Sequence, residues 1–141
     1  MAENGASTLQ ATGAASQNNP LLNLGFNIPF EGITPADVDP AVAELLARSR
    51  RNIEAIENET APPTYDNTLG RLDTATEELE VVMTVVGHLE TVVTSPELRD
   101  AYNRVRPEVS AFYAGIPLRP ALWLCLAGFP LGLSHLRLGR L

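Results

Sequence analysis

The stretch from Leu69 to Ser95, LGRLDTATEELEVVMTVVGHLETVVTS, decides the fold expected for this 141-residue chain. Its apolar residues recur at steps of three and four, which places them on one face of a helix with 3.6 residues per turn. A β-strand would need strict alternation, and the valine pairs do not alternate. We therefore expect a helix roughly 40 Å long, at about 1.5 Å per residue. Its first apolar face comprises Leu72, Ala75, Leu79, Val82, Val86, Leu89 and Val93.

The second half of this helix is apolar on the opposite face too, through Val81, Val85 and Val92. A helix that is apolar on two faces is usually buried between neighbouring helices. We therefore expect Leu69–Ser95 to be the central helix of the fold. His88 lies on the face of these valines, and we expect it to be a buried, hydrogen-bonded structural residue rather than a metal ligand.

A second helix is expected from Pro40 to about Asn58, after a short separate turn at 35–38. Asp39-Pro40 fits an N-cap followed by a proline at the first helical position, and the proline pair at 62–63 prevents continuation. Thr64 then caps the central helix. The apolar stripe of the second helix comprises Val42, Leu45, Leu46, Ser49, Ile53 and Ile56.

A third helix is expected after Ser95, which fits an N-cap, with Pro96 at the first helical position. A proline inside a helix removes one hydrogen bond and clashes with the carbonyl four residues back, at about 3 kcal/mol. Pro107 therefore predicts a kink or break near Arg106. Three helices joined by short loops pack antiparallel, so the predicted fold class is all-α, with antiparallel helical hairpins or a bundle.

The charge balance excludes several classes of protein. The net charge is −7, with 17 acidic residues and ten basic residues, all of them arginine. A nucleic-acid surface needs clustered cations, so we expect no nucleic-acid partner. A single cysteine, Cys125, allows no intramolecular disulfide, and the N-terminus lacks the pattern of a secretory signal. Both features favour a cytoplasmic protein.

The two ends of the chain differ from its centre. Residues 1–18 lack any apolar period, and we expect a disordered tail. Residues 19–118 form the helical region, which begins with an extended segment. Residues 119–141 contain no acidic residue and are broken by glycine and proline, so we expect an irregular tail that is aberrant or translated out of frame. The anchors of the extended segment are expected to be Leu21, Leu22, Phe26 and Ile28.

The sequence contains no set of residues in a spacing typical of a catalytic site. Zinc catalysis needs three protein ligands and an open fourth position, and the chain holds only two histidines, His88 and His135. Cys125 lies in the aberrant tail and is not expected to be a nucleophile. The sequence contains no glycine-rich phosphate loop. We therefore expect no catalytic residue, no cofactor-binding residue and no metal ligand in this chain.

Several stretches together resemble a known family. They are NPLL at 19–22, IPFEGITPADVDPAV at 28–42, PTYDNTLGRLD at 63–73 and GHLETVVTSPELRDAYNRVRPEVSAFY at 87–113. Their order and spacing resemble the N-terminal region of the thimet oligopeptidase and oligopeptidase A family of zinc metallopeptidases, which includes the bacterial dipeptidyl carboxypeptidases. The resemblance covers roughly residues 19 to 118.

The resemblance implies a helical enzyme whose two lobes enclose a deep channel, with the N-terminal helices forming part of its wall and roof. Such an enzyme hydrolyses short peptides at a zinc ion held by a His-Glu-x-x-His helix far downstream. That motif is absent from this chain, so no catalytic residue is carried over. The chain is expected to be a truncated, inactive N-terminal region of a cytoplasmic oligopeptidase.

Two other hypotheses stay open at this point. The chain could be a free-standing helical protein-interaction module with no enzymatic activity, which uses exposed apolar surface to bind a partner. It could also attach to a membrane through the apolar run 121–133. That run has only 13 residues and is too short to span a bilayer, and we favour an out-of-frame tail over a membrane-surface segment.

Overall fold

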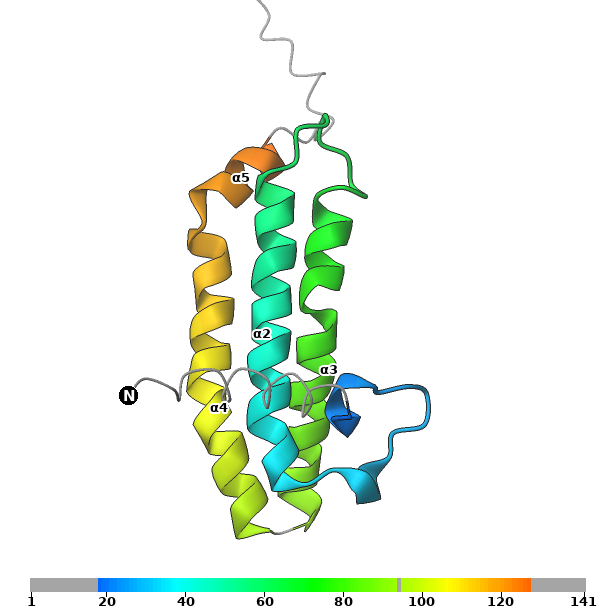
Figure 1. Ribbon diagram of the computed structural model, residues 1–141. Coiled ribbons are helices and arrows are strands. Elements are labelled where there is room, and N and C mark those ends of the chain that lie inside the picture. The colour runs from blue at the N-terminus through cyan, green and yellow to red at the C-terminus, as the bar shows by residue number, and fades with distance from the viewer. Residues whose placement is uncertain (1–17, 94, 128–141) are drawn as a thin grey trace, which may run out of the picture.

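The computed structural model describes residues 18–93 and 95–127, and these form helices and short turns without a strand. Helices α2 (Pro35–Glu57), α3 (Leu69–Val93) and α4 (Pro96–Gly115) lie side by side, with α3 antiparallel to both α2 and α4, and α5 (Pro120–Ala127) lies across one end (Figure 1). Three 3₁₀ turns, η1 (Pro20–Leu22), η2 (Phe30–Gly32) and η3 (Ile116–Leu118), complete the described chain. The predicted all-α class with antiparallel helices is confirmed.

The central helix is α2, and the prediction that Leu69–Ser95 occupies this position is wrong. α2 lies between α3 and α4 and packs against both, whereas α3 and α4 pack less extensively on each other (Figure 1). As an outer helix, α3 buries one face only. Of the three valines predicted on the opposite face, Val85 is buried, whereas Val81 and Val92 are 42% and 62% exposed. His88 is exposed rather than buried.

The core forms from one stripe on each of the three long helices. The stripe of α2 follows the predicted spacing and includes Ser49, which is 4% exposed. On α4, the buried residues continue past Pro107 to Phe112. Residues with exposed fractions of 2% or less include Val38, Val42, Leu45, Leu46, Ile53, Leu79, Val82 and Val86.

α2 begins at Pro35 rather than at Pro40, so the predicted separate turn at 35–38 is wrong. The amide and hydroxyl of Thr34 donate to the Asp37 carboxylate at 2.8 and 2.7 Å, and Thr34 caps the helix. Pro40 lies inside the helix and leaves the carbonyl of Ala36 without its usual amide partner. Ala36 and Pro40 are exposed, so water can solvate that carbonyl and the helix continues.

α4 also continues through a proline. Of the predicted kink or break near Arg106, the break is absent, and the kink stays a prediction. The helix runs without interruption from Pro96 to Gly115 with Pro107 inside it. Pro107 and Asn103, whose carbonyl loses its amide partner, are both exposed. A proline on the solvent side of a helix costs a hydrogen bond but disturbs no core contact.

The segment before α2 forms an arm, residues 18–34, which lies beside the lower half of α3 in Figure 1. Its anchors are Leu21, 1% exposed, and Asn19, 2% exposed. The Asn19 side chain accepts from the Leu21 amide at 2.9 Å and donates to the Asp37 carbonyl at 2.8 Å. The predicted anchor Phe26 is fully exposed, so this part of the prediction for the arm is wrong.

The sequence predicted a disordered tail at residues 1–18 and an irregular tail at residues 119–141. Residues 1–17 and 128–141 lie outside the described residues, so those parts of the prediction have no structural outcome. Pro120–Ala127 form a helix, contrary to the expectation for this part, and Leu122 in it is 2% exposed. The assignment of 119–141 as aberrant or out-of-frame sequence stays a prediction.

Candidate functional site

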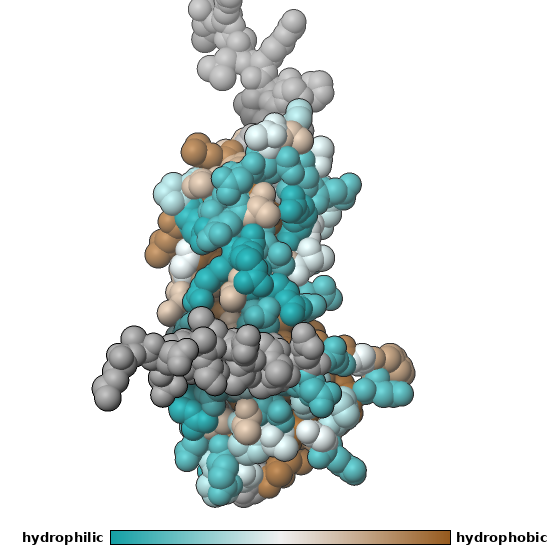
Figure 2. All heavy atoms as spheres, in the orientation of Figure 1, coloured by the Kyte–Doolittle hydropathy of each residue, from teal (hydrophilic) through white to brown (hydrophobic). Residues whose placement is uncertain are grey.

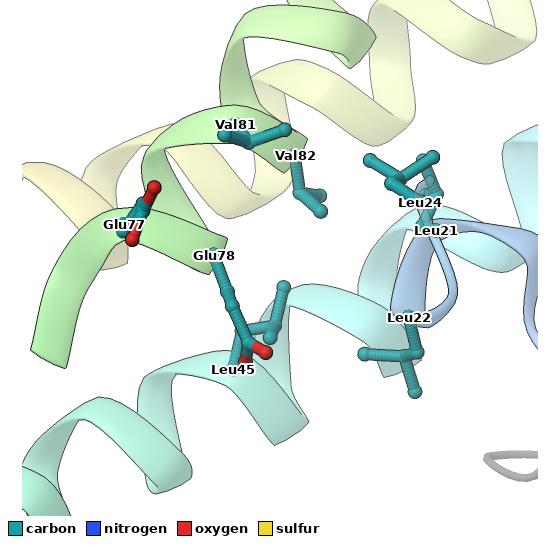
Figure 3. Close-up of a pocket in the computed structure, with 8 residues that line it drawn as sticks. All are labelled: Leu21, Leu22, Leu24, Leu45, Glu77, Glu78, Val81 and Val82. Carbon is teal, nitrogen blue, oxygen red and sulfur yellow. The ribbon is translucent and has the colours of Figure 1, made fainter. Parts of the chain in front are cut away.

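A pocket of about 210 Å³ opens between the arm, α2 and α3. Figure 3 shows the leucines of the arm facing Val82 of α3 across the hollow, with Leu45 of α2 beside it. Leu21, Leu45 and Val82 are buried, whereas Leu22 and Leu24 are half-buried. The pocket thus combines leucine and valine side chains with two glutamates, and its lining comprises Leu21, Leu22, Leu24, Leu45, Glu77, Glu78, Val81 and Val82.

Two carboxylates lie at the rim of this pocket. In Figure 3 the Glu78 side chain points toward Leu45, and Glu77 points away from the hollow. Arg48 binds the Glu78 carboxylate at 2.7 Å and approaches Glu44 at 3.7 Å. Glu77 has no ion-pair partner within the described ranges. These groups are largely solvent-exposed, so each pair contributes at most about 1 kcal/mol of stability. Because Arg51 also lies 3.5 Å from Glu44, two arginines face three glutamates and the rim keeps an excess of one negative charge.

The outer face of α3, which we define as Val92 and Val93, is a second feature of this side of the molecule. Val93 was predicted on the core-facing stripe, so its exposure is a correction. Val93 is 55% exposed, and the Phe30 ring of η2 lies 6.3 Å from the His88 ring. A hollow of about 360 Å³ lies beside them, lined by Phe30, Glu31, Ile33, Pro35, Leu89, Val93, Ser95 and Leu98. Hydrophobic residues are visible in Figure 2 at both ends of the bundle.

At the other end, α5 is held against the C-terminal end of α2. The Arg119 guanidinium donates two hydrogen bonds to the Glu57 carboxylate, one of them at 2.6 Å. The hydrogen bond from Arg119 lowers the pKa of Glu57, and Glu57 in turn raises the pKa of Arg119. Leu118, Trp123 and Leu124 are 78%, 55% and 76% exposed here.

The residues considered as metal ligands or nucleophiles are far apart. His88 lies near η2 at one end of the bundle, and Cys125 lies at the other end, where its thiol donates to the Ile56 carbonyl at 3.5 Å. Across residues 18–93 and 95–127, no three His, Cys, Asp or Glu side chains converge to hold a metal ion. The described side chains therefore do not supply a ligand set that fits zinc.

No single helix in the described part of the chain is long and apolar enough to cross a membrane. Pro96–Leu118 and Pro120–Ala127 meet the criteria of length and hydropathy only as a pair, with a bend of 49° between them.

Sequence reasoning missed two features of this side of the molecule. Asn19 was quoted only as part of a motif, although it fixes the arm to α2. Its signal was Asn-Pro, an N-cap before a proline. The pocket itself gave no local signal, because its walls come from three separate segments.

Comparisons with known proteins place the chain in a family. Residues 42–123 match the family described as Neurolysin/Thimet oligopeptidase, N-terminal domain. Oligopeptidase A of Escherichia coli is 37% identical over 94 residues, and that of Haemophilus influenzae is 34% identical over 97 residues. The probable cytosolic oligopeptidase A of Arabidopsis thaliana is 32% identical over 96 residues.

These matches cover 67% to 69% of this chain but only 13% to 14% of each relative. The chain thus spans a small part of the length of the curated relatives that it matches. The family match includes α3 and α4 whole and extends into α5, beyond residue 118. By this match the chain belongs to the neurolysin/thimet oligopeptidase family, as a counterpart of its N-terminal domain.

Proposed function

We propose that this chain provides the N-terminal helical region of an oligopeptidase, where it forms part of the wall of a channel that admits short peptides. The match of residues 42–123 to the N-terminal domain of the family carries this proposal. The relatives are named oligopeptidases, and one of them is named as probably cytosolic, so the proposal includes peptide substrates and a cytoplasmic location.

In this proposal the zinc ion and the catalytic residues belong to parts of the longer enzyme that have no counterpart in these 141 residues. Zinc would polarise the scissile carbonyl and activate a water molecule in such an enzyme. The residues of this chain would contribute by position: their helices cover the channel, exclude folded proteins and orient the peptide. The chain by itself is proposed to be inactive.

The outer face of α3 supports this role. Val92 and Val93 expose apolar surface at the end of α3, and Val93 borders a hollow that the arm also lines. Exposed apolar surface of this kind marks contact sites between proteins or domains. We propose that the remainder of the enzyme covers this face.

A chimaera tests the proposed function. The 94 matching residues of Escherichia coli oligopeptidase A are replaced by the corresponding residues of this chain, and hydrolysis of a fluorogenic short peptide is measured. We expect the chimaera to keep activity within about tenfold of the parent, and a deletion of the same stretch to abolish it. A folded, zinc-loaded chimaera without activity would contradict the proposal.

The alternative, a free-standing interaction module, also draws on the exposed outer face of α3. A module should give a cooperative thermal transition and a defined oligomer by analytical ultracentrifugation. A region that needs the rest of an enzyme should instead aggregate or bind hydrophobic dyes through the uncovered valines.

A further inference from the structure

We propose that the pocket between the arm and α3 binds the amino-terminal residue of a short peptide. An apolar side chain, such as that of leucine, fills the pocket, and the peptide's α-ammonium group lies at the rim beside Glu78. That the natural occupant is a peptide rests on the proposed function, whereas the pocket and its charges are properties of this chain.

The size and lining of the pocket fit one apolar side chain. An apolar cavity of about 150 Å³ is large enough for a benzene molecule, and this pocket measures about 210 Å³. Six of its eight lining residues are leucine or valine. The leucine and valine side chains offer water no hydrogen-bond partner, so an apolar side chain that displaces water from them gains free energy.

The rim selects a positive charge close to that side chain. Glu78 and Glu77 line the pocket, and Arg48 is the basic residue paired with Glu78. An ionised carboxylate has two oxygens and accepts several hydrogen bonds. Glu78 can therefore keep Arg48 and also accept from an ammonium group.

The α-ammonium group fits this arrangement better than a basic side chain further along the peptide. It is attached to the same Cα as the side chain in the pocket, so it stays at the pocket mouth. In an extended peptide, successive side chains point to opposite sides. An arginine at the second position would therefore point away from Glu78.

Three probes test the proposal on the full ¹⁵N-labelled chain by NMR titration: Leu-Ala-amide, N-acetyl-Leu-Ala-amide and Gly-Ala-amide. At pH 6.5 the peptide amine is charged, since its pKa is about 7.7–8.0. We expect Leu-Ala-amide to bind with a Kd on the order of 1 mM and to shift the amides of Leu22, Leu24 and Val82. Acetylation should weaken binding about threefold to fivefold, and the glycine probe should bind at least about tenfold more weakly.

Variants separate the pocket from the charge. Val81→Phe fills the mouth of the pocket and should abolish binding, while Val92→Phe makes the same change about 16 Å along the helix and should leave it intact. Glu78→Gln should weaken Leu-Ala-amide about threefold without affecting the acetylated probe. Because Val81 and Glu78 are exposed, each variant should keep the fold, which the dispersion of the same NMR spectra checks.

Equal binding of the charged and acetylated probes would overturn the ammonium site, and equal binding of the leucine and glycine probes would overturn the apolar pocket. An absence of shifts at these amides up to 10-fold above the expected Kd on the order of 1 mM would overturn both. The chimaera is scored separately by hydrolysis. An active chimaera without binding at the pocket therefore supports the proposed function and contradicts the peptide site. Binding at the pocket with an inactive chimaera supports the peptide site and contradicts the proposed function.

Discussion

α2 and α3 have similar lengths, 23 and 25 residues, but opposite positions in the fold. α3 has the more apolar sequence, yet it lies at the outside and exposes Val81 and Val92. α2 carries exposed or half-buried arginines at 48, 50 and 51, and it is the helix that contacts both neighbours. The apolar content of a helix therefore sets how much surface it could bury. The position of the helix in the fold decides how much of that surface is buried in this chain.

The largest expected effect lies in the core of α2. Leu46 has no exposed surface, so Leu46→Ala leaves a cavity and should lower the free energy of unfolding by about 2–5 kcal/mol. Urea unfolding followed by circular dichroism measures this change. Leu124→Ala, at a residue that is 76% exposed, is the matched control and should change stability by no more than about 0.5 kcal/mol. Similar losses for both variants would contradict the central position of α2.

The next largest effect on stability is expected at the proline inside α4, the other helix that packs on α2. Pro107→Ala restores an amide donor for the carbonyl of Asn103 and should raise the free energy of unfolding by about 2 kcal/mol, after allowance for the freer unfolded chain. Thermal unfolding measures it. Ser110→Ala, at an exposed position on the same helix, should change stability by only about 0.5 kcal/mol. Destabilisation by Pro107→Ala would mean that the proline ring has a packing role.

A pH-dependent effect follows from the contact between α5 and α2. Arg119 lowers the pKa of Glu57 in the folded state. This contribution is fully present above the ordinary pKa of a glutamate, and it is lost as the pH falls through the lowered value. Arg119→Gln should therefore cost about 1–2 kcal/mol at pH 7 and less at pH 3.

Urea unfolding at both pH values measures the difference. Arg106→Gln is the control, because Arg106 is exposed and forms no ion pair within the described ranges, and its cost should be small and independent of pH. An equal cost of Arg119→Gln at both pH values would show that Arg119 acts through packing alone.

The smallest effect on stability, and the most specific effect on function, is expected at the outer face of α3. Val92→Ser removes exposed apolar surface and should change the stability of this chain by no more than about 0.5 kcal/mol. In the chimaera the same change should reduce peptide hydrolysis, because the enzyme's other region loses a contact. Thr91→Ser, on the neighbouring exposed residue, should leave hydrolysis unchanged. An unaffected Val92→Ser chimaera would place the contact elsewhere.

The sequence predicted the three long helices because their signals are local. Spacing of apolar residues located α3, and Ser95 with Pro96 marked the start of α4. The helix start at Pro40 and the break at Pro107 were wrong predictions, since the rule for proline does not say whether the freed carbonyl faces water. The exposures of Ala36 and Asn103 supply that information, and they depend on where each helix packs.

The candidate site could not be predicted in the same way. Its walls come from the arm, α2 and α3, and residues 21, 45 and 82 have no periodic relation in the chain. The same limitation explains His88, which was placed in a core because the valines beside it were assigned to a second buried face. Only the packing of α2 against α3 shows that this face is outside.

The central position of α2 also affects the order in which the domain can form during synthesis. α2 leaves the ribosome before α3 and α4, because synthesis proceeds from the N-terminus. Each later helix therefore meets a partner that already exists, and contacts that are close in sequence form fastest. We expect nascent chains that expose only residues up to about 95 to contain a protease-protected α2–α3 hairpin, and unprotected chains of that length would show that α4 must arrive first.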